Sequence, residues 1–549
     1  MAFFLVELLM RAHRGWPRPV WRAFLPCLTL FILPLPGALR LGLDWAGPPL
    51  VERLCVLGLA LAGFWYFRGN RRDLGALRAG LVCATAVTCA LGLAQALNVQ
   101  LLPSLTAGDQ RSALFGNVNM AAEFLGFALL ALLVLDPPPL SRALALGREA
   151  LLAYAFVELF FLASRSALLA VGAAVIAILA TGRLRPRRLG VLLAAALLGG
   201  VVFAQAGARM STFVGTASGP EHLLRPEVQE YKRDSSTLRL AAWEGTIALL
   251  RDHPAGVGLG NFPDAFIPYL LERTPAPSET LYFRSPHDEG LRLMAEGGIL
   301  ALPLALGLGF ALGRRLWRDP LVARGKTEAG ALLIAGTAFF SVEAIFQFPL
   351  DVAPSAAAIA LLFGLGAACL DPQTKVSPRR PLLTAAWVAG GLIAAGFVGS
   401  TAVRVARSEW RFVNARGDRA APADACRLNP RNLPACVTAA WLAGRAGDAS
   451  GARHTLERVL ERSPYYFPAI KLLGEQALAA GERQAACRYL WIYDEFFARR
   501  TTVHRHLGRY CTPEEFAAFW ATIPMPHYGS FPFAPQSGPE APAPTGSSR

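Results

Sequence analysis

A histidine followed by two carboxylates stands within residues 285–289, immediately before a long apolar run. His287 is a candidate general base, because the pKa of an imidazole lies near neutral pH. Glu296, deeper in the same run, is either a partner for an arginine or a carboxylate of the site. The alternative interpretation is a polar helix start, in which the helix dipole favours Asp288 and Glu289. The segment therefore offers a candidate for proton transfer.

Three arginines border or interrupt other apolar runs. Arg111 precedes the run that begins near residue 119, Arg165 lies between two runs, and Arg239 lies four residues before Trp243. Guanidinium groups bind phosphate oxygens through paired hydrogen bonds. A charge at the depth of Arg165 is costly in a membrane, which makes this arginine a functional candidate.

Each arginine also has a structural explanation. Asn117 or Asn119 can cap a helix that follows Arg111, and Arg165 can extend from a turn to the membrane interface. Arg239 can be an exposed helix residue. Taken together, however, three arginines, one histidine and several carboxylates predict group transfer from a lipid-linked diphosphate to an acceptor hydroxyl. The pattern requires no metal or cofactor, and no CxxC or HExxH spacing occurs.

The composition indicates where these residues must lie. The chain has 549 residues, of which 54% are hydrophobic and 17% charged, and its formal net charge is +15. This hydrophobicity excludes a disordered chain, and the low charge content argues against an ordinary soluble enzyme. A charge of +15 fits either nucleic-acid binding or basic loops on the inner side of a membrane protein.

Apolar runs fill most of residues 1–404 and predict an all-α, polytopic membrane bundle of about 11 or 12 transmembrane helices. The first run is interpreted as a retained span rather than a cleaved signal. The expected spans are 23–43, 53–67, 78–97, 119–135, 150–163, 167–181, 189–207, 291–312, 328–348, 355–371 and 382–404.

Basic residues are divided unevenly between two sets of short loops. With a cytoplasmic N-terminus, the six inward segments hold 22 Lys and Arg residues, whereas the short outward loops hold two. This asymmetry obeys the positive-inside rule and places the C-terminal region on the outer side. The net charge is therefore a topology signal and gives no support to nucleic-acid binding.

Two stretches are too long and polar to be turns. The first is an outward loop at 208–290, in which a helix is expected over Leu238–Leu250 with Ser235 or Ser236 as its cap. The second is residues 405–528, expected to form an extramembrane helical domain. Residues 529–549 are rich in Pro, Ala, Gly and Ser and are expected to be a disordered tail.

An internal repeat with an offset of 34 residues runs through the second stretch. This is the period of tetratricopeptide helix pairs, although two repeats are fewer than a free-standing array needs. The sequence leaves open whether Cys426, Cys436, Cys487 and Cys511 form disulfides. The matching positions are Asn429-Pro430 with Ser463-Pro464, Gly447-Asp448 with Gly481-Glu482, Ala452 with Ala486, and Leu456 with Leu490.

Four blocks carry a family resemblance that covers about residues 50–370. They are Arg111 with Phe115–Ala122, then Ser164–Leu168, then Arg239 and Trp243 with His253–Phe262, and last Pro286–Ile299. In this order the sequence resembles the bacterial O-antigen ligase and polymerase family. The C-terminal repeat lies outside the resemblance, although many members carry such an appendage.

The resemblance implies a C-type membrane fold and a metal-independent, inverting glycosyltransferase of the bacterial inner membrane. The implied donor is an undecaprenyl-diphosphate-linked glycan, and the implied acceptor is a hydroxyl of a glycan or of lipid A-core at the periplasmic face. By motif, His287 would be the catalytic base, and Arg165, Arg239 and Arg111 would bind the diphosphate. The supporting site residues would be Asn119, Asp288, Glu289 and Glu296.

The sequence departs from the family pattern beside the histidine. Asp288 stands where Asn or Ser is common, Gly290 where an aromatic is common, and Arg292 where Gln is common. These differences bear on acceptor choice more than on the core reaction.

Several functions remain open at this point. Ligation to lipid A-core, polymerisation of a surface polysaccharide and transfer to a protein share the same chemistry. An appended repeat that recruits a protein partner or guides a growing chain slightly favours a polymerase. A transporter of polyprenyl-linked glycans would instead have broken helices and midplane charges in paired halves. A membrane scaffold would not need its His and Arg positions.

Overall fold

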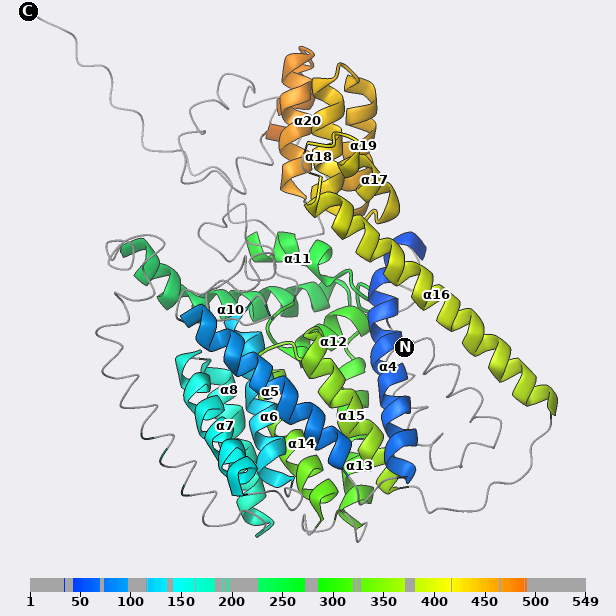
Figure 1. The fold of residues 1–549 in the computed structure, drawn as a ribbon. Helices are drawn as coiled ribbons and strands as arrows, with labels where there is room; N and C mark the ends of the chain where they lie inside the picture. The colour runs from blue at the N-terminus through cyan, green and yellow to red at the C-terminus, as the bar shows by residue number, and fades with distance from the viewer. Residues whose placement is uncertain are drawn as a thin grey trace, which may run out of the picture. The chain divides into compact units, whose positions relative to one another are not determined.

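The computed structural model describes a set of helices (Figure 1), and the residues it describes contain no strand. The all-α fold class is therefore confirmed. The described residues are 34, 43–69, 74–96, 115, 117–135, 142–162, 164–182, 190, 194, 197, 226–271, 285–318, 322, 327–370, 381–415, 417–463, 466–487 and 489–490.

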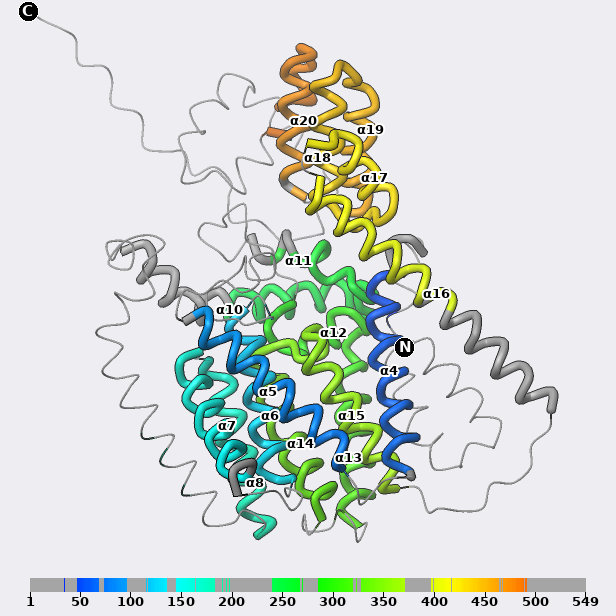
Figure 2. The backbone as a smooth tube through the Cα atoms, viewed as in Figure 1, coloured from blue at the N-terminus to red at the C-terminus, as the bar shows by residue number. Residues whose placement is uncertain are grey.

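The helices keep the order of the chain, as the tube in Figure 2 shows. They are α4 Leu43–Gly69, α5 Gly75–Ala96, α6 Val118–Val134, α7 Arg142–Phe161, α8 Arg165–Ala180, α10 Pro226–Asp252, α11 Phe262–Leu271, α12 Glu289–Gly297, α13 Ala301–Arg318, α14 Glu328–Phe346, α15 Ala353–Cys369, α16 Pro381–Val413, α17 Ala421–Leu428, α18 Leu433–Arg445, α19 Ala449–Arg462 and α20 Phe467–Ala479.

The chain divides into two compact units, Met1–Ala469 and Ile470–Arg549. The helices up to α19 all belong to the first unit, and α20 crosses the boundary. The helix α16 runs without a break through residue 404, so the division into domains at that residue stays a prediction.

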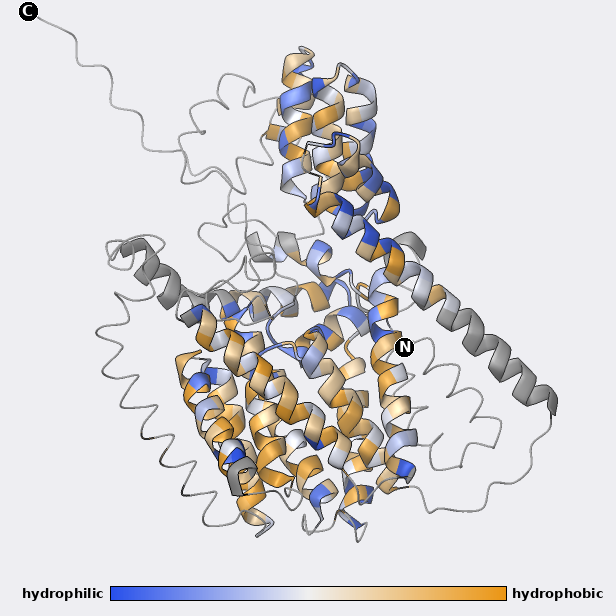
Figure 3. Cartoon of the chain, viewed as in Figure 1, coloured by the Kyte–Doolittle hydropathy of each residue, from blue (hydrophilic) through white to orange (hydrophobic). Residues whose placement is uncertain are grey.

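Apolar helices of the first unit pack into a bundle, which Figure 3 shows as largely hydrophobic. The helix α4 lies against α15, α14 lies against α8, and α6 contacts both α5 and α14. A Cβ atom added at Gly364 would lie 2.5 Å from the Ala60 carbonyl oxygen and 2.6 Å from the Phe64 nitrogen. Only glycine permits this approach of α15 to α4, and close backbone packing of this kind stabilises helices in lipid.

Three helices are long and apolar enough to span a membrane: Gly47–Arg68, Gly75–Gln95 and Glu328–Phe346. Three shorter apolar helices are Val118–Val134, Arg165–Ala180 and Ala353–Cys369. They coincide with expected spans. The expected spans 23–43 and 189–207 lie almost entirely outside the described residues, so the count of 11 or 12 stays a prediction.

The expected continuous span 291–312 is wrong, because the structure breaks it into α12 and α13. Gly298 has a φ of 89°, which favours glycine, and its N–H bonds to the Met294 carbonyl at 2.7 Å. The Ile299 N–H then bonds to the Pro254 carbonyl at 3.0 Å. The glycine pair thus ends α12 and makes room for the segment that follows α10.

The outward-loop helix begins earlier than expected. The helix α10 starts at Pro226 and ends at Asp252, so Ser235 and Ser236 lie within it and do not cap it. A proline is well tolerated in the first helical turn, because the N–H that it lacks would have no partner within the helix.

The repeat positions of the C-terminal helices have matching local structures. Asn429 and Ser463 each follow the last residue of a helix, α17 and α19. Gly447 and Gly481 both have positive φ, 94° and 74°. A disulfide joins Cys426 to Cys436, and Cys487 is also disulfide-bonded. The assignment to tetratricopeptide repeats stays a prediction.

Candidate functional site

His287 lies two residues before α12 in an unusual backbone conformation. Its φ is 56°, and it is the one non-glycine residue with positive φ in the described part of the chain. Such a conformation costs on the order of 1–3 kcal/mol and persists only where the surroundings enforce it. Asp288 provides part of that constraint, because its side chain caps α12 by accepting a bond from the Leu291 N–H at 2.7 Å.

The surroundings of His287 keep its ring neutral at pH 7. Burial and then the positive charge of Arg239 lower the pKa of His287 to about 4, and a side-chain hydrogen bond with Gln347 acts in the opposite direction. The ring also packs edge-to-face on Phe348, with 5.2 Å between the ring centroids. A neutral imidazole can accept a proton from a hydroxyl.

The structure brings one predicted arginine, Arg239, into electrostatic reach of this histidine, and it brings Arg165 into reach of Arg239. Arg165 is the first residue of α8 and is exposed, whereas Arg239 on α10 is partly buried. Burial lowers the pKa of Arg239, Glu343 opposes this effect, and the charge of Arg165 adds to it. Two guanidinium groups that repel each other beside a neutral histidine form a site suited to an anion.

Polar side chains at the end of α14 connect the histidine to α8. The Gln347 Nε2 donates to the Ser166 hydroxyl at 3.3 Å, and Ser164 and Ser166 hydroxyls lie 3.3 Å apart. Glu343, one turn before Gln347, is fully buried and is the acidic neighbour of Arg239. The sequence analysis missed both α14 residues, although an ionisable residue within an apolar run is a signal for Glu343.

The other predicted site residues have structural contacts of their own or lie outside the described residues. The Asn119 backbone N–H donates to the Asn117 side chain at 2.8 Å, so this pair forms the start of α6, as its helix-cap explanation predicts. Arg111 lies outside the described residues. Among the described residues, no group of three or more His, Cys, Asp or Glu side chains is placed to hold a metal ion.

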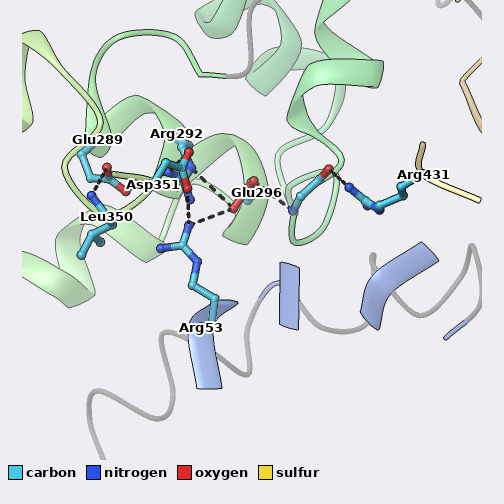
Figure 4. Close-up of polar contacts among 8 residues, drawn as sticks. Arg53, Glu289, Arg292, Glu296, Leu350, Asp351 and Arg431 are labelled. Atoms are coloured by element: carbon cyan, nitrogen blue, oxygen red, sulfur yellow. Dashed lines mark hydrogen bonds and ion pairs between the residues drawn. The ribbon is translucent and has the colours of Figure 1, made fainter. Parts of the chain in front are cut away.

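Glu289 and Glu296 belong to a second cluster of charges, drawn in Figure 4. Arg292 pairs with Glu289 at 3.5 Å, with Glu296 at 3.9 Å, and most closely with Asp351. Arg53 of α4 pairs with Glu296 at 3.9 Å and Asp351 at 3.7 Å. We call these five residues the α12 charge network. The sequence analysis missed the parts played by Arg53 and Asp351.

The α12 charge network borders a cavity of about 410 Å³ whose other walls are mainly apolar side chains, such as those of Val56 and Phe363. Burial raises the pKa of Glu289 and of Glu296, and Arg53 opposes that shift for both. Buried carboxylates of this kind need their arginine partners, because an unpaired charge in an apolar setting is costly.

Comparison with known proteins gives one match. Residues 150–306 match a family model described as O-antigen ligase. This segment contains Arg165, Arg239 and His287, and also the α12 residues of the charge network. No curated protein matches the chain, and no solved structure does.

Proposed function

We propose that the chain, whose residues 150–306 match the O-antigen ligase family model, transfers an undecaprenyl-diphosphate-linked glycan to an acceptor hydroxyl. The family gives the protein a role in surface polysaccharide synthesis as an integral membrane, glycosyltransferase-like enzyme. The proposed location is the bacterial inner membrane, with the site and the C-terminal region on the periplasmic side.

One observation carries the proposal. Two arginines, Arg165 and Arg239, act electrostatically on one another, and Arg239 acts on a neutral histidine held in a strained backbone conformation. Holding two like charges together raises the free energy of the empty site, and a diphosphate would relieve that repulsion. Strained residues held by their surroundings occur frequently at functional sites.

The proposed reaction is a single displacement at the anomeric carbon of the donor glycan. His287 takes the proton of the acceptor hydroxyl as the hydroxyl oxygen attacks the anomeric carbon of the donor glycan. The bond between that carbon and the diphosphate oxygen breaks, with inversion at the carbon, and undecaprenyl diphosphate leaves. Arg165 and Arg239 would stabilise the charge on the leaving diphosphate. Gln347 would orient the imidazole through its hydrogen bond.

The test is complementation of a strain that lacks the gene, with surface polysaccharide and the amount of membrane protein measured together. The variants are His287→Ala and Arg239→Ala. Matched controls are His454→Ala on α19 and Arg251→Ala on α10, because both residues are exposed. We expect the site variants to accumulate lipid-linked glycan and the controls to restore the surface polysaccharide.

Normal polysaccharide in both site variants, at normal protein levels, would favour a scaffold and remove the enzyme proposal. The deletion strain separates two versions of the reaction. Loss of glycan from lipid A-core with a lipid-linked polymer left behind indicates a ligase, and a product with a single repeat unit indicates a polymerase.

A further inference from the structure

An arginine from the C-terminal helices reaches the segment that follows α10. Arg431 lies in the turn between α17 and α18. Its Nη1 donates to the Gly260 carbonyl at 3.0 Å, and its Nη2 donates to the Asn261 side-chain oxygen at 3.2 Å. Asn432 anchors the same turn on α16, since its Nδ2 donates to the Ser408 hydroxyl at 3.2 Å. The guanidinium is therefore presented from a fixed turn.

The residues that Arg431 holds are bonded to α12. We call residues 256–261 the glycine turn. The Gly260 N–H donates to the Glu296 carboxylate at 3.0 Å, and the Gly258 N–H donates to the Glu296 carbonyl at 3.0 Å. A Cβ atom at Gly256 would lie 2.5 Å from the Gly298 nitrogen. The glycine turn is therefore packed and hydrogen-bonded directly against the end of α12.

The other end of α12 is bonded to the residues around His287. Glu296 pairs with Arg53 and Arg292, which both pair with Asp351 (Figure 4). The Leu350 N–H donates to Glu289 at 3.4 Å. The Asp351 N–H donates to the Phe348 carbonyl at 2.9 Å, and the Phe348 ring packs on His287. An unbroken set of contacts thus runs from Arg431 to the histidine.

A second contact holds the C-terminal helices to the same region. The Ser463 hydroxyl, at the end of α19, donates to the Asp264 carboxylate of α11 at 2.5 Å. Both residues are buried. Two separate contacts fix orientation as well as position, which one contact does not.

We propose that the helices α17–α19 are a positioning element of the transfer site and that Arg431 is a positioning residue acting through the glycine turn and α12. This inference rests on the proposed function. The helices then do more than offer a surface to a partner, because they set the placement of α12, and with it the placement of His287.

A pH profile distinguishes positioning from simple structural support. The charged groups that face Glu296 are Arg53 from α4, Arg292 and Glu289 within α12, Asp351 after α14, and Arg431. Burial raises the pKa of Glu296, and Arg431 is one of the charges that lower it. Removing the guanidinium should therefore keep Glu296 protonated to a higher pH and weaken the Arg53 and Arg292 pairs there.

The experiment uses the full-length protein in detergent, added to membranes of the deletion strain, which supply donor and acceptor. Consumption of lipid-linked glycan is measured from pH 5 to pH 9 in the variants Arg431→Gln and Arg431→Lys. The matched control is Arg427→Gln, an exposed arginine of α17 that pairs with Asp424. We expect Arg431→Gln to lower kcat by roughly tenfold to a hundredfold, as misplacement of a site does, with little change in KM for the donor.

Three further results sharpen the test. The acid limb of the Arg431→Gln profile should move to higher pH, Arg431→Lys should recover part of the rate, and Arg427→Gln should match the parent protein. Ser463→Ala should lower kcat less than Arg431→Gln does, without a pH shift. If Arg431→Gln is lost from membranes, Arg431→Lys and Ser463→Ala decide by the same kcat criterion.

Parent-like turnover and pH profile in Arg431→Gln, with His287→Ala inactive, would overturn the positioning role and leave the proposed function intact. Transfer by His287→Ala would instead overturn the proposed function. The two failures are therefore distinguishable.

Discussion

The His287 site lies immediately before α12 and the α12 charge network lies along it, and the two differ in how their charges are paired. In the network, Arg53 and Arg292 each lie within 4 Å of a carboxylate. At the site, Arg165 and Arg239 act on each other, and no ion pair of either is formed among the described residues. The network pairs both of its arginines with carboxylates at close range, whereas at the site Glu343 is the acidic neighbour of Arg239 and forms no ion pair with it among the described residues.

The way in which charges are paired distinguishes a structural ion-pair network from a ligand-binding site, although charged residues of both kinds look alike in a sequence. Paired buried charges fix the geometry of the helices that carry them, and removing one partner leaves the other uncompensated. Like charges held near a neutral base gain stability only when a ligand arrives. Changes in the site should therefore affect transfer more than folding, and changes in the network should affect folding more than transfer.

The largest expected effect comes from His287→Gly compared with His287→Ala. Both variants lack the base and should lower kcat by about 10²–10⁴-fold. Glycine accepts a φ of 56° without strain, so the Gly variant should have a free energy of unfolding about 1 kcal/mol higher than the Ala variant. Thermal unfolding in detergent measures the second quantity. Equal stabilities would mean that the strain is absent.

Arg239→Lys tests whether the site needs the guanidinium fork or only a positive charge. Lysine cannot reproduce two parallel hydrogen bonds to phosphate oxygens. We expect a loss of about 10²-fold or more in kcat, the size seen when one stabilising donor is removed, with an unchanged melting temperature. Retention of the full rate would show that charge alone is sufficient.

Arg292→Met tests the structural role of the α12 charge network. It leaves Arg53 alone with the carboxylates of Glu289, Glu296 and Asp351, and breaking a buried pair in this way costs about 3–5 kcal/mol. The melting temperature should fall well below that of Arg314→Met, an exposed control on α13. A parent-like melting temperature would contradict the structural role of the network.

The smallest expected effect is a pH dependence set by His287. Its pKa is lowered from 6.5 to about 4 in the folded protein, so its contribution to stability is present above pH 6.5 and is lost as the pH falls towards 4. His287 should add a limb near pH 4 to the profile of kcat/KM, which reports the free enzyme, and this limb is separate from the one that Glu296 sets at higher pH. The His287 limb of kcat should lie at higher pH, since a bound diphosphate would offset the charge of Arg239.

The sequence predicted the helical class, and it also singled out candidate site residues, for reasons that differ from residue to residue. Arg165 and His287 stand out because an ionisable residue in or beside an apolar run of a membrane protein is a functional candidate. The α6 cap at Asn117 was predictable because it is local. Gln347, Asp351 and Arg431 were not, because each matters through contacts with residues far away in the chain.

The break after α12 also depends on a contact with a residue far away in the chain, which the local sequence does not show. Hydropathy over 291–312 reads as one span, because the window averages over Gly297 and Gly298. The break depends on the positive φ of Gly298 and on the Pro254 carbonyl that receives the Ile299 N–H. A partner forty-five residues away in the chain leaves no trace in a local average.

The disulfide between Cys426 and Cys436 makes the conformation of the Arg431 turn depend on oxidation of these two cysteines. The bond joins α17 to α18 across a separation of 10 residues, and Arg431 lies inside the loop that it closes. Such a bond reduces the freedom of the turn before its tertiary contacts form, and it persists only in oxidising compartments. Maturation of this part of the molecule is therefore tied to the redox chemistry of its surroundings. We therefore expect a thiol reductant to affect the proposed transfer reaction through the Arg431 turn, without altering any of the candidate site residues.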